Sequence, residues 1–248
     1  MVTLADANTT DLRNVQDAVR ERLKNASSLD QAAQQAATIL FDAFRNDLVL
    51  SRVYVTVPFG KLPPQNRAFV QDLLKAKAGA ERLTATTPVL TLMGTHGAEP
   101  EWNDRRLSRG HVGIPLVTTS FVGAIPMIAR LLQEMGVGIQ WIDTQDLTRV
   151  ERLMDGGLCG LFYVRDARTE RDTAGRLVIP AQDFVSRYQI RSVFGMGGSY
   201  MGGLFATFIL FAREEVPKAV AQRYVPLVNV FKAATTRLAL HEHFFAES

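Results

Sequence analysis

The side chains best suited to chemistry in this 248-residue chain gather in and beside a polar, glycine-bearing loop at residues 94–110. Arginine offers a planar fork of donors for a carboxylate or phosphate, tryptophan a stacking face, and histidine a group that titrates near neutral pH. This mixture predicts a site for a small anionic or aromatic ligand. The alternative is an ordinary arginine-rich surface loop whose tryptophan fills a small satellite core. The predicted ligand-binding residues are Trp102, Asn103, Arg105, Arg106, Arg109 and His111.

Two histidines, His96 and His111, are the candidates for holding a metal or a haem. Neither has a second histidine or a cysteine at the spacing of a zinc-ligand pair, so no metal site is predicted. Haem held through one axial histidine stays open as an alternative. The identity of any cofactor is left unassigned.

The sequence offers no clear candidate for a catalytic nucleophile. Cys159 is the single cysteine, which excludes an internal disulfide and thiol cycling with an internal resolving partner. The glycine-rich segment 195–203 has neither phosphate-loop nor nucleophile-elbow spacing, and it predicts a tight hairpin turn. We therefore expect no catalytic residue and no enzyme. The rival hypothesis is an enzyme that uses the 96–111 loop, with His111 as acid or base and Arg105 or Arg109 holding an anion.

The composition is that of an ordinary folded protein, with 47% hydrophobic and 21% charged residues. The 28 basic and 25 acidic residues leave a net charge of +3, and the basic residues are scattered, so no nucleic-acid partner is expected. No apolar run is long enough for a membrane span, and no export signal opens the chain. We expect a cytoplasmic protein with no membrane partner.

Hydrophobic periodicity predicts the elements that must position the loop. Helices are predicted over residues 9–26, 29–46, 63–77, 126–135 and 216–240. Strands are predicted over residues 48–57, 88–93, 137–142, 158–164, 190–196 and 204–211, with a short extended piece at 112–117. The polar segment 165–176 predicts a solvated loop or hairpin tip, and the last two strands are expected to pair as a hairpin.

The last predicted helix carries apolar residues at alternating steps of four and three, which is a heptad pattern. These residues are Val220, Tyr224, Leu227, Phe231, Ala234 and Leu238. Pro226 is expected to bend this helix or to move its start. Packing on the chain's own sheet and packing against a second copy both remain open.

The segment that ends with the two glycine-separated strands resembles the closing hairpin and last helix of GAF domains. The matching residues are Tyr188, Ile190, Arg191, Ser192, Gly203 and Leu204. Residues 29–33 resemble the start of the first core helix of that family, and residues 96–111 look like the GAF-type modules found in front of bacterial histidine kinases and nucleotide cyclases. The resemblance spans residues 29–240. It implies an α+β fold, GAF-like or PAS-like, with a central antiparallel sheet of about six strands, terminal helices on one face and a ligand pocket on the other.

The sequence lacks the motifs of several GAF subgroups that have a known ligand or activity. Bilin-binding members usually follow their cysteine with histidine, whereas Gly160 follows Cys159 here. The free methionine sulfoxide reductases rely on several cysteines, and the cyclic-nucleotide signature is absent. The ligand therefore stays unnamed.

These observations predict an N-terminal amphipathic helix at residues 1–27, a GAF-like sensor domain at 28–240 and a tail at 241–248. The expected function is non-catalytic: a bacterial sensory domain that binds a small molecule and signals through its terminal helices to a downstream protein. We expect a homodimer in which residues 12–23 and 220–238 form a helical bundle. The alternative is an interaction or dimerisation module with no ligand.

Overall fold

A run of apolar and β-branched residues forms the central strand β1 (Leu48–Pro58) in a computed structural model of the chain. The structure describes residues 2–75, 82–137, 139–144, 159–200 and 203–246. On one side β1 pairs with β2 (Pro88–Gly97), and on the other with β6 (Phe205–Ala212), both antiparallel.

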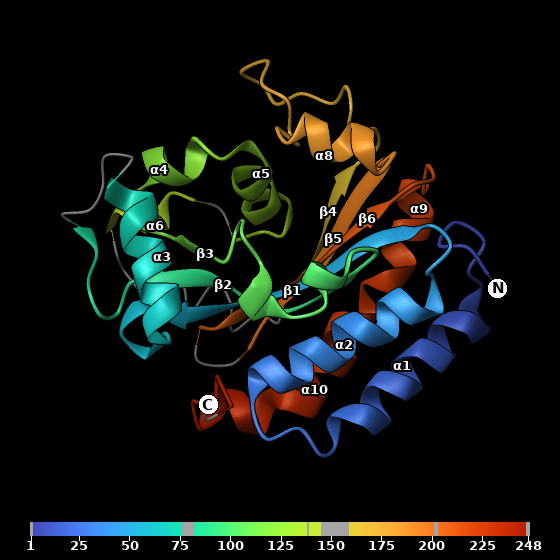
Figure 1. Ribbon diagram of the computed structural model, residues 1–248, viewed down its shortest axis with the longest axis horizontal. Coiled ribbons are helices and arrows are strands. Elements are labelled where there is room, and N and C mark those ends of the chain that lie inside the picture. Colours follow the sequence, from blue (N-terminus) through green and yellow to red (C-terminus); the bar gives the residue numbers. More distant parts are fainter. Residues whose placement is uncertain (1, 76–81, 138, 145–158, 201–202, 247–248) are drawn as a thin grey trace.

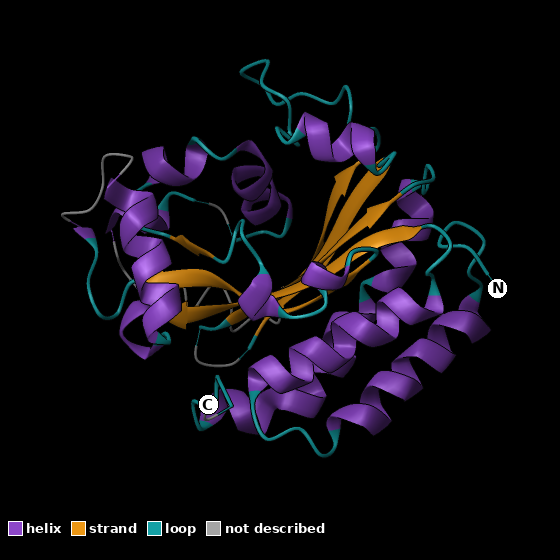
Figure 2. Ribbon diagram, viewed as in Figure 1, coloured by secondary structure: helices purple, strands orange, loops and turns teal. Residues whose placement is uncertain are grey.

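Within the described residues the sheet has six strands in the order β3-β2-β1-β6-β5-β4, and every neighbouring pair is antiparallel (Figure 2). The outer strands are β3 (Gly113–Pro115), β4 (Cys159–Val164) and β5 (Ser192–Ser199). β5 and β6 form the expected hairpin. The sequence-based prediction of an α+β fold around a six-stranded antiparallel sheet is confirmed.

Three helices from the two ends of the chain lie on one side of this sheet: two of them pack on its face and the third packs on those two (Figure 1). The third is α1 (Thr9–Leu23), and the two on the sheet are α2 (Leu29–Ala43) and α10 (Pro226–Leu240). Asn8 opens α1 with a capping box, and Ser28 caps α2. The alanine-rich face of α2 lies so close to β2 that a Cβ at Gly94 would be 2.3 Å from the backbone of Ala33. Glycine is therefore required at this crossing.

The opposite face carries α5 (Pro126–Glu134) over β4, with α3 (Pro64–Lys75), α4 (Thr119–Gly123) and α8 (Gln182–Arg187) around it (Figure 1). The residue that caps the end of α5, Met135, lies directly above glycines of the sheet. A Cβ at Gly160 would be 2.5 Å from the Cα of Met135, and one at Gly197 would be 2.5 Å from its sulfur. The missing side chains allow α5 to pack closely on the sheet.

The heptad residues of the last helix face the interior of this same chain. The Phe231 ring is fully buried, with its centroid 5.2 Å from that of Phe208 on β6, and Val220, Tyr224, Leu227 and Leu238 are buried as well. Of the two packing hypotheses, the one in which this seam packs on its own sheet is confirmed. A dimer of the terminal helices would have to use their other faces, and it stays a prediction.

Three local predictions were wrong. Residues 137–142 do not form a strand where the structure describes them, because Gly136 ends α5 with φ of 78° and a short helix, α6 (Trp141–Thr144), follows. The strand predicted over residues 190–196 begins only at Ser192, and α8 precedes it at residues for which no helix was predicted. The single helix predicted over residues 216–240 is divided into α9 (Lys218–Ala221), η5 (Gln222–Tyr224) and α10. The expectation that Pro226 moves the start of the last helix is confirmed, because α10 begins at this proline.

Both chain ends bond to distant elements. The amide groups of Leu29 and Asp30, at the start of α2, donate to the carbonyls of His243 and Phe244 at 2.8 and 3.0 Å. Near the other end, the amide of Leu4 donates to the carboxylate of Asp47 at 2.6 Å. The division into residues 1–27, 28–240 and 241–248 stays a prediction. None of the described helices has the length and apolar character needed to cross a membrane.

Candidate ligand-binding site

A cavity of about 200 Å³ lies against the sheet face that the terminal helices leave free. Its floor consists of side chains from the two central strands, which are Leu50, Arg52, Tyr54, Ile209 and Phe211. The period of two along a strand brings these residues to one face. Ile125, Met127 and Ile128 at the start of α5 form one wall, and the 96–111 loop contributes to another. The interior is therefore mainly apolar.

Arg52 is the principal polar group of this cavity. Its Nη1 atom donates to the hydroxyl of Tyr54 at 3.2 Å and to the carbonyl of Gly110 at 3.3 Å, and Nη2 donates to the hydroxyl of Ser108 at 3.2 Å. Its Nε atom is buried and has no hydrogen-bond partner. Among the described residues no carboxylate forms an ion pair with Arg52, so all of its partners are neutral.

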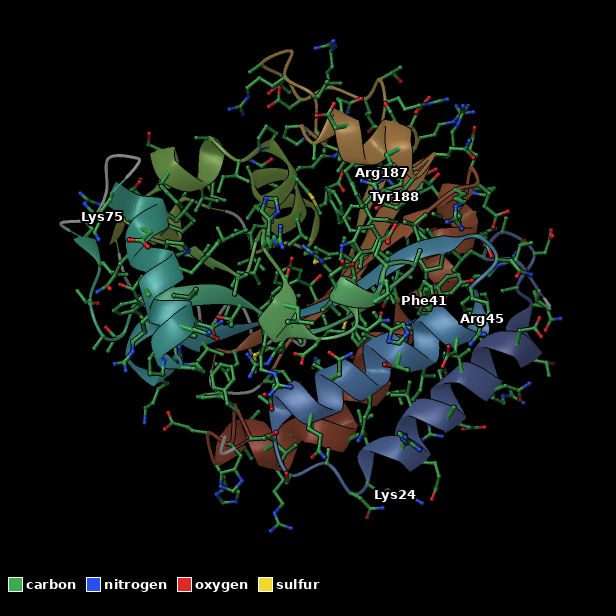
Figure 3. All side chains as sticks on the ribbon, in the orientation of Figure 1. Lys24, Phe41, Arg45, Lys75, Arg187 and Tyr188 are labelled. Atoms are coloured by element: carbon green, nitrogen blue, oxygen red, sulfur yellow. The ribbon has the colours of Figure 1, made fainter. Side chains whose placement is uncertain are left out.

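An aromatic cluster closes one end of the cavity. The ring of Trp102 lies 4.8 Å from that of Tyr188 and 5.6 Å from that of Phe184, centroid to centroid, and Phe184 also packs on Phe211. The Tyr188 hydroxyl donates to Glu99 at 2.8 Å. This cluster attaches the 96–111 loop to α8, where Arg187 and Tyr188 lie next to each other (Figure 3).

His111 lines the mouth of the cavity in an unusual backbone conformation. Its φ angle is 55°, in the left-handed region that few residues other than glycine adopt. It also lines a shallower hollow of about 380 Å³ together with Phe69, Leu73 and Ile114. His111 thus lines both hollows. Its exposed side chain is placed to contact a ligand that enters from solvent.

The other predicted site residues lie away from this cavity. Arg105 forms a buried ion pair with Asp30, whose Oδ2 accepts from Nη2 at 2.6 Å and from Nε at 3.2 Å. Arg106 is exposed and pairs with Asp104, and this contact lowers the pKa of the Asp104 carboxyl. The side-chain oxygen of Asn103 accepts from the amide of Gly97.

Arg109 is exposed and lines none of the cavities described above and below. Trp102 and His111 are therefore the predicted residues that the fold brings to the sheet cavity. Asn103, Arg105 and Arg106 gather at a different cavity, discussed below. That any of the six binds a ligand stays a prediction.

His96 lies on the opposite side of the sheet from His111, beside α2. Its Nδ1 atom is 3.1 Å from the Thr38 hydroxyl, and its ring is 5.0 Å from that of Phe41. Burial lowers the pKa of His96, which favours the neutral ring. The described residues include no group of three or more histidine, cysteine, aspartate or glutamate side chains arranged for a metal ion.

Arg52 is the site residue that the sequence analysis missed. The signal was present, because Arg52 is the one charge in the otherwise apolar or hydroxyl-bearing segment 48–57. A charge inside a central strand is rare unless it is paired or functional.

No protein-family model matches the chain, and no curated protein matches it. Among solved structures, the GAF domain of a phosphoenolpyruvate-protein phosphotransferase from Coxiella burnetii is similar, with 10% identity, a TM-score of 0.48, and 95% of this chain and 99% of that chain covered. A phycocyanobilin-bound GAF domain from a cyanobacterial phytochrome has 9% identity and a TM-score of 0.49, with 94% and 97% covered.

The free methionine-R-sulfoxide reductase of Neisseria meningitidis has 11% identity and a TM-score of 0.47, with 95% of each chain covered. At sequence identities of 9–11% and TM-scores of 0.47–0.49, these structural similarities carry no information about a ligand or an activity of this chain.

Proposed function

We propose that this chain is a GAF-type sensory domain that binds a small apolar carboxylic acid in the cavity above β1 and β6. The observation that carries the proposal is the guanidinium group of Arg52, which lines the cavity with a buried, unpartnered Nε and no acidic partner among the described residues. The residue is half-buried and its Nη atoms bond only to neutral groups, so its charge is available to pair with an anion. A ligand carboxylate would supply the missing charge.

The other walls of the cavity indicate the size and polarity of the rest of the ligand. Ile125, Ile128, Ile209 and Phe211 offer an apolar surface, and Trp102 adds a stacking face at the edge. The volume of about 200 Å³ lies below the roughly 300–1,000 Å³ of pockets for drug-sized molecules. An acid of the size of benzoate suits this space, whereas a haem or a bilin does not.

We expect ligand binding to affect the terminal helices through the central strand β1. Arg52 faces the cavity, and the reverse face of β1 packs against α2. A change in the position of Arg52 on ligand binding would therefore act on the strand that supports the terminal helices. A homodimer through the free faces of these helices, a downstream signalling partner, and a cytoplasmic location in a bacterium belong to the proposal.

The two alternative functions, an interaction module and an enzyme, would each require different features of the cavity. An interaction module without a ligand needs no uncompensated charge in its interior. An enzyme needs a second titratable group to work with His111, and Tyr54 and Arg52 are the other titratable groups among the described lining residues. The described lining includes no carboxylate or thiol that could act with His111, so binding is the function that the cavity supports best.

The test is a titration of the protein with benzoate, followed by calorimetry and by ligand-observed NMR. We expect saturable binding, with benzamide, which matches benzoate in shape but carries no charge, failing to compete for it. Absence of benzoate binding at millimolar concentration, or equal competition by benzamide, would contradict a carboxylate site.

A further inference from the structure

A second and larger cavity, of about 620 Å³, lies at the start of α2, away from Arg52. α2 forms one side of it, the beginning of α3 another, and the segment 103–106 with the chain end at 245–246 completes it. Three of the six residues predicted from sequence line it, namely Asn103, Arg105 and Arg106.

Two side-chain amides that line this cavity have an unsatisfied polar atom. Asn66, at the first turn of α3, is only 5% exposed, and its Nδ2 donor has no partner. On the facing helix α2, the Oε1 acceptor of Gln35 is buried and also has no partner. Buried polar groups are nearly always hydrogen-bonded, because leaving one unpaired costs more than the bond itself contributes. Both atoms lie just beneath the cavity surface while their residues line it, so a small turn of each side chain would offer one donor and one acceptor to an occupant.

The charges around the cavity cancel locally. Arg105 pairs with Asp30 at 2.6 Å, and Arg106 pairs with Asp104 at 2.6 Å. These are the charged residues among the described lining, so no unbalanced charge attracts an ion. The occupant that these contacts favour is neutral, in contrast to the acid proposed for the other cavity.

The apolar part of the lining comes from ring-bearing side chains and a thioether. It consists of Pro63, Pro64, Met93 and Phe245. Rings and a thioether of this kind suit the face of a planar group.

We propose that this cavity binds a small, planar, neutral amide. The ligand's carbonyl oxygen accepts from Nδ2 of Asn66, its N–H group donates to Oε1 of Gln35, and its apolar body packs on the prolines, Met93 and Phe245. A single amide group carries both the acceptor and the donor that the two side chains lack. The site is independent of Arg52 and of the carboxylate cavity.

The test compares benzamide with N,N-dimethylbenzamide, which has no N–H donor, by calorimetry on the intact chain. We expect the dimethyl compound to bind at least about tenfold more weakly, the loss of one good hydrogen bond in a buried site. Equal affinities of the two compounds, or no binding of benzamide at millimolar concentration, would overturn the proposal.

Variants locate the site. Asn66→Leu and Gln35→Met keep the side-chain size and remove the polar atoms, and each is expected to weaken benzamide binding by about tenfold or more. Gln65→Met, which changes a lining residue with no unpaired buried atom, is the matched control and should bind as the wild type does. Thermal melting checks that each variant is folded.

Benzoate separates this proposal from the proposed function. We expect its binding to be unchanged in Asn66→Leu and Gln35→Met. If benzamide binding is instead lost in Arg52→Met and retained in these two variants, the amide occupies the sheet cavity and the second site does not exist. Failure of benzoate to bind would leave the benzamide result intact.

Discussion

The hydroxyl group of Tyr54 accepts a hydrogen bond from Nη1 of Arg52 at 3.2 Å, two positions away on the same face of β1. A tyrosine hydroxyl can satisfy an N–H group, but it cannot neutralise a guanidinium charge. The pair therefore holds the charged group in position over the cavity and leaves its charge for a ligand.

Replacing Arg52 with methionine should weaken benzoate binding at least about tenfold, because charge-assisted hydrogen bonds contribute roughly 1.5–3 kcal/mol. The free energy of unfolding should change by less than about 1 kcal/mol, since removing an uncompensated charge offsets the three lost hydrogen bonds. Calorimetry and urea denaturation measure the two effects. Arg109→Met is the control, because Arg109 is exposed outside the cavity. If Arg109→Met lost affinity and Arg52→Met did not, the loop would be the binding site.

Arg105 is expected to act as a structural residue. Its ion pair with Asp30 is almost fully buried, with side-chain exposures of 15% and 10%, and Asp30 also accepts from the amide of Ala246 at 3.0 Å. Arg105→Met should lower the free energy of unfolding by about 3 kcal/mol, because it leaves a buried carboxylate without its cation. Arg106→Met, at a 68% exposed side chain, should change it by less than about 0.5 kcal/mol. Equal effects in urea denaturation would contradict this assignment.

Stability should depend on pH through Asp47. Burial, reinforced by contact with Glu214, raises the pKa of Asp47 to about 7 from its ordinary value of 3.8. The folded protein therefore binds this proton more tightly than the unfolded chain. The resulting stabilisation is complete below pH 3.8 and is lost as the pH rises through about 7, by at most about 1.4 kcal/mol per pH unit.

Asp47→Asn imitates the protonated form and should flatten this part of the pH profile. Urea denaturation between pH 5 and pH 8 measures the difference, and the variant should be the more stable protein at pH 8. A wild-type stability that rises over this interval while the variant's stays constant would refute the role of Asp47.

The close approach of α5 to the sheet predicts that Gly160→Ala is disruptive. Its Cβ would be 2.5 Å from the Cα of Met135, a backbone atom that no side-chain rotation can move. We expect a loss of about 1–3 kcal/mol in the free energy of unfolding and weaker benzoate binding, since α5 carries Ile128. Gly123→Ala is the control, because no atom lies within 4 Å of its Cβ position. An unchanged Gly160→Ala protein would show that α5 is not fixed by this contact.

The heptad seam provides a further test. Phe231→Ala should cost about 3–5 kcal/mol of stability and leave the oligomeric state unchanged, because Phe231 packs on Phe208 of the same chain. Leu240→Ala, at a 63% exposed residue, serves as the comparison. Light scattering together with thermal melting decides the matter: a Phe231→Ala protein that keeps its stability but loses a dimer would place the seam between two chains.

Most of the fold could be predicted because its elements have strong local signals. Period-two runs identified β1, β2 and the hairpin of β5 and β6, and Asn8, Ser28 and Pro226 mark helix starts for known physical reasons. The strand predicted over residues 137–142 was wrong because a short apolar run is compatible with either a strand or a buried turn. Only the packing of the neighbouring elements decides between the two.

The candidate site was harder to predict. The six loop residues share a polar segment, yet the fold sends Trp102 and His111 to one cavity and Arg105 and Arg106 to another. Whether an arginine binds a ligand or an aspartate depends on what lies beside it in space, and Asp30 is 75 positions from Arg105. The unpaired amide of Asn66 likewise becomes visible only when its neighbours are placed.

The hydrogen bonds from Leu29 and Asp30 to His243 and Phe244 affect when the start of α2 can fold during synthesis. Asp30 also accepts from the amide of Ala246, 216 positions later in the chain. A ribosome releases α2 early, at a stage when the partners of its first turn do not yet exist, and domains usually fold as units during synthesis. The amide groups at the start of α2 must stay in water until residues 243–246 have been synthesised. The first turn of α2 is therefore completed by residues more than 210 positions later in the chain.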